Sequence, residues 1–134
     1  MRSLVKSLMV LLAALTAVNA YAHHGFATEF DVNRPVELKG KVTKVELINP
    51  HSWIHIEVIG EDGKPVAWMI EGGSPNALLR RGINRNTIAI GSELVIRGYG
   101  TRDGLNKAVG REIEYADGRP LFFQGSAPDG ETVP

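Results

Sequence analysis

The 134-residue chain has no cysteine and no net charge, with 15 basic and 15 acidic residues. Without cysteine it has neither a disulfide bond nor the thiol that would anchor a lipoprotein. The balanced charge excludes the dominant positive field of a nucleic-acid-binding protein. Long apolar runs are also missing beyond the N-terminus, where the stretch from Leu8 to Val18 is too short to span a bilayer.

Residues 1–22 have the three parts of a secretory signal peptide. Arg2 and Lys6 supply the positive end, an apolar stretch follows, and Ala20-Tyr21-Ala22 fits the small-x-small cleavage rule. We therefore expect a periplasmic or secreted protein with no membrane insertion after cleavage. An uncleaved membrane anchor is the alternative, which the short apolar run disfavours. Cleavage would leave 112 residues with 13 basic and 15 acidic side chains, enough for one domain.

Short alternating segments predict a β protein. Apolar residues occupy every second position in segments 36–42, 52–58 and 66–70, and a phase change near Thr43-Lys44 predicts a β-bulge. The Gly60–Lys64 segment contains Asp-Gly and predicts a hairpin loop. Two more strands are expected after Gly91, and Leu121-Phe122-Phe123 is a candidate for a short last strand.

One clear helix is expected between the third and fourth strands. Ser74 is a good N-cap, Pro75 suits the first helical position, and Gly82 suits the position after the helix. This order matches an all-β, OB-like barrel of five or six strands with one short helix; a small open sandwich is the alternative. We expect this single domain to span residues 23–123, followed by a disordered tail at 124–134.

All four histidines lie in two places, as the His23-His24 pair and as His51 and His55 in the second strand. His51 and His55 share a strand face but stand about 13 Å apart, so an unbulged strand cannot bring both to one metal. Either can complete a site that begins at the amino terminus. The simpler interpretation makes His51 a turn residue and His55 a cross-strand partner.

The predicted cleavage site suggests copper chemistry. A cut after Ala22 makes His23 the first residue, and its amine and imidazole nitrogens can chelate one Cu(II), with His24, His51 or His55 as a third nitrogen. A cut after Ala20 leaves Tyr21-Ala22-His23, whose amine, two amides and imidazole form a square plane. We therefore expect an exported binding or accessory module; the alternative is that a histidine pair follows the cleavage site by chance.

A second candidate surface contains Trp53 and the basic residues Arg80, Arg81 and Arg85. Trp53 can offer a stacking face and the arginines can attract an anion, which predicts a metal-independent protein- or glycan-interaction module as the alternative function. Ordinary packing of the indole and a solvated helix end explain the same residues. The sequence gives little support for an enzyme. No cysteine nucleophile exists, and Ser52 follows His51 in a strand, where adjacent side chains point to opposite faces and cannot form a nucleophile–base pair.

Two strings are specific enough to carry a resemblance. The first runs from Gly40-Lys41-Val42 to Asn49-Pro50-His51-Ser52-Trp53, and the second is Gly73-Ser74-Pro75-Asn76-Ala77-Leu78-Leu79-Arg80-Arg81-Gly82. With the Ala-His-His start and a late Asp-Gly, residues 20–123 resemble a family of small exported bacterial proteins of unknown function. The resemblance implies export and a single small β domain. It also favours His23, His24 and His51 over His55 as residues to test.

Overall fold

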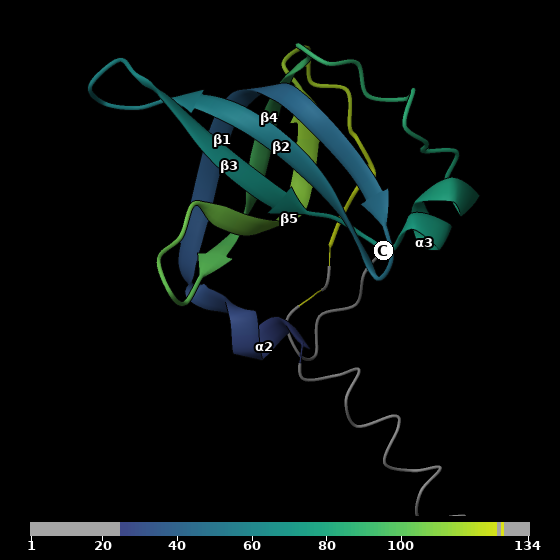
Figure 1. Ribbon diagram of the computed structural model, residues 1–134, viewed down its shortest axis with the longest axis horizontal. Coiled ribbons are helices and arrows are strands. Elements are labelled where there is room, and N and C mark those ends of the chain that lie inside the picture. Colours follow the sequence, from purple (N-terminus) through teal and green to yellow (C-terminus); the bar gives the residue numbers. More distant parts are fainter. Residues whose placement is uncertain (1–24, 126, 128–134) are drawn as a thin grey trace, which may run out of the picture.

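The computed structural model describes residues 25–125 and residue 127. The predicted signal peptide, His23, His24 and most of the predicted tail lie outside the described residues. The described chain forms five strands and two short helices (Figure 1). In order these are α2 (Gly25–Glu29), β1 (Phe30–Ile48), β2 (His51–Ile59), β3 (Pro65–Glu71), α3 (Pro75–Arg80), β4 (Glu93–Thr101) and β5 (Lys107–Tyr115). Neither helix has the length and hydropathy of a membrane span.

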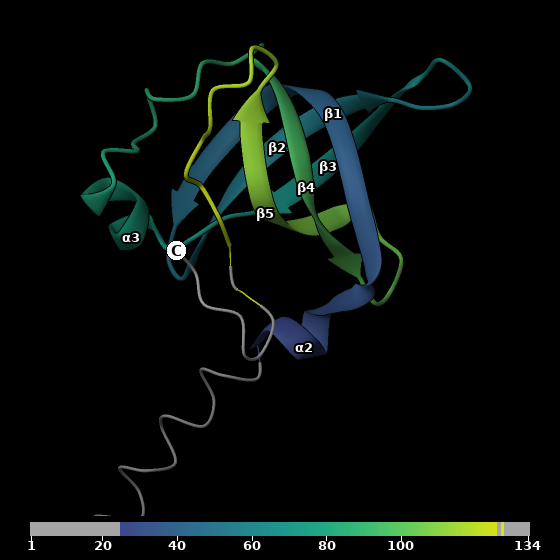
Figure 2. The same cartoon turned by 180° about the vertical axis from the view of Figure 1, so that it is seen from behind.

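All five strands belong to one sheet with the order β1-β2-β3-β5-β4, and β1 also pairs with β4, so the hydrogen-bonded pairs form a closed ring. The pairs are antiparallel except for β3 and β5, which run parallel over three residue pairs. The long β1 pairs with two strands: its first half pairs with β4 and its second half pairs with β2 (Figures 1 and 2). These pairings confirm the predicted β-rich class.

The local sequence signals agree with the observed strands and turns. The register of β1 against β2 shifts between Val42 and Lys44, which confirms the bulge expected near Thr43-Lys44. The hairpin between β2 and β3 turns at Gly63, whose φ of 76° suits glycine. The predicted phase change and the predicted hairpin therefore both correspond to features of the sheet.

Helix α3 also begins and ends where its sequence predicts. The Ser74 hydroxyl accepts a hydrogen bond from the Ala77 N–H at 3.3 Å, and Pro75 is the first helical residue. Gly82 has a φ of 79° after the last turn. A helix this short is stable only when it packs, and the buried Leu78 and Ile83 provide that packing.

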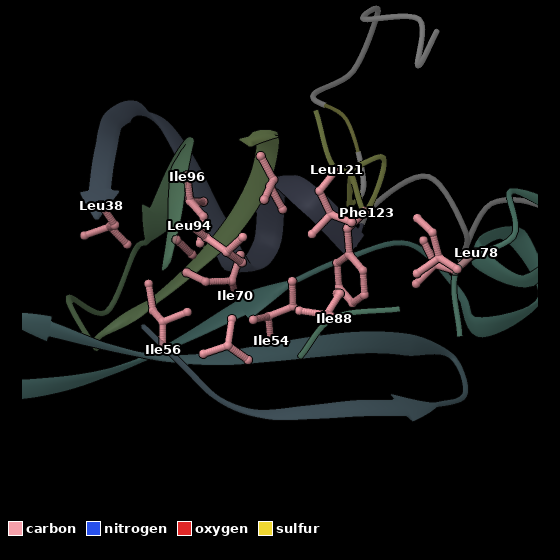
Figure 3. Close-up of a cluster of buried hydrophobic side chains, with 14 residues drawn as sticks. Leu38, Ile54, Ile56, Ile70, Leu78, Ile88, Leu94, Ile96, Leu121 and Phe123 are labelled. Atoms are coloured by element: carbon pink, nitrogen blue, oxygen red, sulfur yellow. The ribbon is translucent and has the colours of Figure 1, made fainter. Parts of the chain in front are cut away.

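The main core fills the inside of the ring. Apolar side chains from β2, β3, β4 and β5 meet there, and Figure 3 shows Ile54 and Ile56 of β2 facing Leu94 and Ile96 of β4. Leu121 and Phe123 close one end of this core. Within residues 25–125 the candidate sixth strand at Leu121-Phe122-Phe123 does not form: isolated bridges occur only at the flanking residues, from Pro120 to Glu114 and from Gln124 to Gly72.

A second, smaller cluster lies on the outer face of the sheet and explains a helix that the sequence did not predict. Phe26 of α2 is buried in a cluster with Phe30 and Val109, and Tyr99 packs against it. The Phe26 ring meets the Tyr99 ring edge-on at 6.0 Å. A five-residue helix has no stability alone and no apolar periodicity to reveal it, so the expectation of a single helix was wrong.

Candidate functional site

Strand β2 presents its two histidines on the outer face of the sheet. Ser52, Ile54 and Ile56 are buried inside the ring, whereas His51, Trp53 and His55 alternate with them and are partly exposed. This alternation confirms the predicted division of faces. Although they share a face, each histidine has its own carboxylate partner, and these partners come from different strands.

His51 pairs with Glu71, the last residue of β3. Its Nδ1 lies 3.3 Å from the Glu71 Oε1, and the side chains are 44% and 4% exposed. Glu71 lies opposite Trp53 of β2 and Val109 of β5 in the register, so it belongs to the outer face despite its burial. A buried carboxylate is costly unless it is partnered, and the imidazole of His51 is one of its partners.

The C-terminal segment packs closely against the backbone at the end of β3, next to Glu71. Gly72 donates its N–H to the Ser52 carbonyl at 2.7 Å, and it forms an isolated bridge with Gln124. A Cβ on Gly72 would lie 2.1 Å from the Phe123 ring, and one on Gly125 would lie 2.8 Å from the Glu71 carbonyl oxygen. The two glycines therefore let the C-terminal segment lie close over the end of β3. Gln124 and Gly125 are therefore part of the packing at this end of the sheet.

His55 lies in a different environment. Its Nε2 is 2.6 Å from the Glu46 Oε2, and Glu46 also pairs with Lys44 at 2.5 Å. The hydrogen bond from Lys44, followed by that from His55, holds the pKa of Glu46 below its usual range. The three side chains form a cross-strand network, which is the structural role that the simpler interpretation of His55 describes.

The residues of the second candidate surface lie on separate elements. Lys107 places its Nζ 4.7 Å from the centroid of the Trp53 ring, and it also pairs with Glu29 of α2. A ligand that stacks on this side of the ring would have to displace Lys107. Arg80 and Arg85 are exposed near α3. Arg81 is exposed too but donates to the Gln124 Oε1 at 3.2 Å, so it helps to hold the C-terminal segment.

Metal coordination by the described residues alone is limited to pairs of donors. Within residues 25–125 and residue 127, no group of three or more His, Cys, Asp or Glu side chains could hold a metal ion. His51 and Glu71 form one such pair, and further donors would have to come from elsewhere in the chain. The predicted donors His23 and His24 lie outside the described residues, immediately before α2.

The sequence marked His51 but did not connect it to Glu71. Nothing in the chain order places these residues together, because their contact depends on the register between β2 and β3. One local feature of the sequence does point to Glu71. Glu71 continues the outward phase of β3 and is followed at once by Gly72 and Gly73, a combination that allows another segment to pack closely over the strand end.

Comparison with known proteins places the chain in a family. A family model described as a family of unknown function, DUF6152, matches residues 11–111. The chain belongs to this family. The DUF6152 match spans α2, β1 to β4 and α3 and the first half of β5, so both histidine–carboxylate pairs lie within it. A search of curated proteins found no match.

Proposed function

We propose that this protein is an exported copper-binding module that works in the periplasm or outside the cell. After cleavage behind Ala22, the amine and imidazole nitrogens of His23 chelate one Cu(II), and His51 supplies a further nitrogen. Nitrogen donors in a tetragonal arrangement suit Cu(II). His24 is an additional donor next to this chelate, whereas His55 belongs to the network with Glu46 and Lys44.

The direction of α2 carries this proposal. Glu29, the last residue of α2, pairs with Lys107 of β5, whereas Phe26, one turn earlier, packs in a cluster with Val109. Followed backwards, α2 therefore runs along the outer face from Lys107 towards Val109. Val109 lies opposite Glu71 in the parallel β3–β5 register, so this direction leads towards the His51–Glu71 pair.

The length of chain involved is short. His23 precedes Gly25, the first residue of α2, by two residues, and two residues reach about 7 Å at full extension. Contacts on both sides of α2 hold it against the sheet, including the hydrogen bond from Arg102 Nε to the Ala27 carbonyl at 2.7 Å. A helix held in this way keeps a terminal chelate within a short distance of the outer face, where His51 is accessible.

The fold by itself does not identify a ligand. The order β1-β2-β3-β5-β4, the bulge in β1 and the position of α3 between β3 and β4 are the features from which we infer an OB-like barrel. Such folds carry many unrelated functions, so the copper proposal depends on the donors and not on the architecture.

The test starts from protein purified after export, with its N-terminus defined by intact mass and sequencing. Cu(II) is then titrated in competition with a chelating probe, for the chain that begins at His23 and for a chain with Gly-Pro-Pro added before it. A single added glycine would make His24 the third residue of an amine–amide–imidazole chelate, whereas the added prolines have no amide N–H to lose. We expect one Cu(II) per chain, and a loss of affinity of more than about 100-fold on extension, because the amine no longer chelates with the imidazole. Unchanged affinity in the extended chain would overturn the proposal.

Two other outcomes are informative. A chain that begins at Tyr21 would bind copper through its terminal amine, two amides and His23, which would contradict the role given to His51. Binding of a protein or glycan that survives chelators but fails in Trp53→Ala would support the metal-independent interaction module instead. That alternative stays a prediction, and it would require displacement of Lys107 from the side of the indole that it covers.

A further inference from the structure

We propose that the outer side of α3 docks on a membrane surface rich in anionic phospholipid. The α3 surface consists of Leu79, Arg80, Arg81, Arg85 and Phe122, all of which are exposed. Figures 1 and 2 show that α3 stands outside the sheet at one side of the molecule, where a flat surface can reach it. The contact is peripheral and inserts no helix. The proposal is independent of copper, because none of the histidines takes part.

The charge of the chain is unevenly distributed around α3. The segment from Gly72 to Ser92 contains three arginines and no lysine, aspartate or glutamate, so it carries a charge of +3 in a chain whose net charge is zero. The turn that carries Arg85 lies against the end of α3, because the Thr87 hydroxyl donates to the Gly82 carbonyl at 3.4 Å. The positive charge is therefore concentrated at the C-terminal end of this short helix.

These arginines differ from most other cations of the protein in their lack of an acidic partner. Among the described residues, neither Arg80 nor Arg85 forms an ion pair or a side-chain hydrogen bond. Arg81 donates to neutral acceptors, the Gln124 Oε1 and the Phe122 carbonyl. The cations that do pair with a carboxylate include Lys39, Lys44, Lys64, Arg97, Arg102, Lys107 and Arg119. The α3 surface thus keeps its charge available for an anionic partner.

Two large apolar side chains are exposed beside these cations. Leu79 of α3 is 55% exposed and Phe122 is 56% exposed. The neighbours of Phe122, Leu121 and Phe123, are buried in the core, so the chain directs the intervening ring outward. The Phe122 carbonyl is 3.5 Å from the Nη1 of Arg81, which places this residue next to the end of α3. Apolar groups that are exposed together mark an interaction site more often than single ones do.

An anionic bilayer matches both parts of the α3 surface. Guanidinium groups pair well with phosphate oxygens, and basic residues are attracted by the negative potential of anionic lipids. The apolar side chains can enter the boundary between headgroups and acyl chains. Nucleic acid is a poorer partner, because the chain has no dominant positive field. An acidic protein would satisfy the arginines, and it is the alternative that the experiment separates.

The experiment measures co-sedimentation with vesicles for the chain without residues 1–22, so that the apolar N-terminal segment does not contribute. Vesicles of phosphatidylcholine are compared with vesicles of an equimolar mixture of phosphatidylcholine and phosphatidylglycerol. We expect binding to the mixed vesicles that weakens as salt is added, and little binding to the neutral ones. Equal binding to both kinds of vesicle, or binding to neither at low salt, would overturn the proposal.

Paired variants locate the surface. A basic side chain near an anionic membrane contributes roughly a fivefold change in binding, so Arg80→Gln combined with Arg85→Gln should weaken binding by about 25-fold. Lys39→Gln combined with Lys64→Gln removes the same charge elsewhere and should stay within about threefold of the wild type. Lys64 belongs to the hairpin between β2 and β3, which lies across the molecule from α3 (Figures 1 and 2). Equal losses in the two double variants would contradict docking through α3.

A label tests whether the apolar side chains reach the lipid. The chain has no cysteine, so Asn76→Cys places a single environment-sensitive fluorophore on α3, three residues before Leu79 and on the same face. Mixed vesicles should shift its emission to the blue, whereas a label at Leu105→Cys, in the loop between β4 and β5, should not respond. No shift at position 76 would overturn the proposal. Displacement of the protein from vesicles by polyglutamate at equal charge concentration would do the same and assign the surface to an acidic protein.

Discussion

The two histidine–carboxylate pairs of β2 use the same residue types on the same strand face but differ in their surroundings. In the His51–Glu71 pair the acid is buried and the imidazole is the more exposed partner, at 4% and 44%. In the His55–Glu46 pair both side chains are about one-quarter exposed, and Lys44 completes a three-residue network. The position of each pair along the strand, and not the residue type, therefore decides which histidine is available to a ligand.

The origin of the difference lies in what covers each acid. Glu46 lies within the β1–β2 ladder, and Lys44 and His55 are its charged and polar neighbours on the sheet face. Glu71 lies where β3 ends, and Gly72 and Gly125 let the C-terminal segment approach closely. We therefore expect changes at the two pairs to have very different consequences for copper and for stability.

The largest expected contrast is between His51→Ala and His55→Ala. Loss of His51 removes a ligand, so the Cu(II) affinity of the mature chain should fall by more than about 100-fold, beyond the range typical of outer-shell residues. Loss of His55 should leave the affinity within about twofold of the wild type, since its Nε2 already faces Glu46. Competition titrations of both variants check this, and equal losses would remove the distinction between the two pairs.

A smaller effect is expected from releasing α2. Phe26→Ala removes the buried ring that holds this helix against Tyr99 and Val109, so the terminal chelate loses its fixed approach to His51. Cu(II) affinity should fall by roughly tenfold through lost preorganisation, while the backbone amide signals of β2 stay in place. Val32→Ala, at an exposed position two residues after Phe30, is the control and should bind copper like the wild type. Wild-type affinity in Phe26→Ala would show that α2 plays no part in the site.

The smallest expected effect concerns pH and the His55–Glu46 pair. The pKa of Glu46 is lowered in the folded protein, mainly by the hydrogen bond from Lys44 and then by that from His55. A carboxyl group with a lowered pKa stabilises the fold at pH values above its unfolded pKa, and this contribution is lost as the pH falls through the folded pKa. The melting temperature of Glu46→Gln should therefore lie slightly below that of the wild type at neutral pH and converge with it in acid. A constant difference across this range would assign the effect to packing.

The elements that sequence alone predicts are those whose signals are local. The alternation from Val36 to Val42, the bulge near Thr43-Lys44 and the Ser74–Gly82 capping pattern each depend on neighbouring residues, and all three are confirmed. Helix α2 was missed because five residues carry no periodicity, and only the contacts of Phe26 with Tyr99 and the outer cluster reveal why it forms.

The candidate site likewise has one residue that the sequence reveals and one partner that only the structure reveals. His51 stands out in the sequence because histidines are few and because it lies in a specific Asn-Pro-His-Ser-Trp string. Its partner Glu71 is 20 residues later, on the next strand, and the segment that packs against the end of that strand is more than 50 residues further on. Such an environment is a property of the tertiary structure, and the Gly72-Gly73 pair after Glu71 is the one local hint that separates it from Glu57 or Glu46.

The most direct test of the central claim is the pattern of signals that one equivalent of Cu(II) removes from the ¹H–¹⁵N spectrum of the mature chain. Paramagnetic broadening reports proximity to the metal, and the two histidines are about 13 Å apart along the strand. We predict that the signals of Gly25, Phe26, His51 and Gly72 disappear together, while those of His55 and Lys44 persist. Loss confined to Gly25 and Phe26, or loss centred on His55, would contradict a copper site shared by the N-terminus and His51.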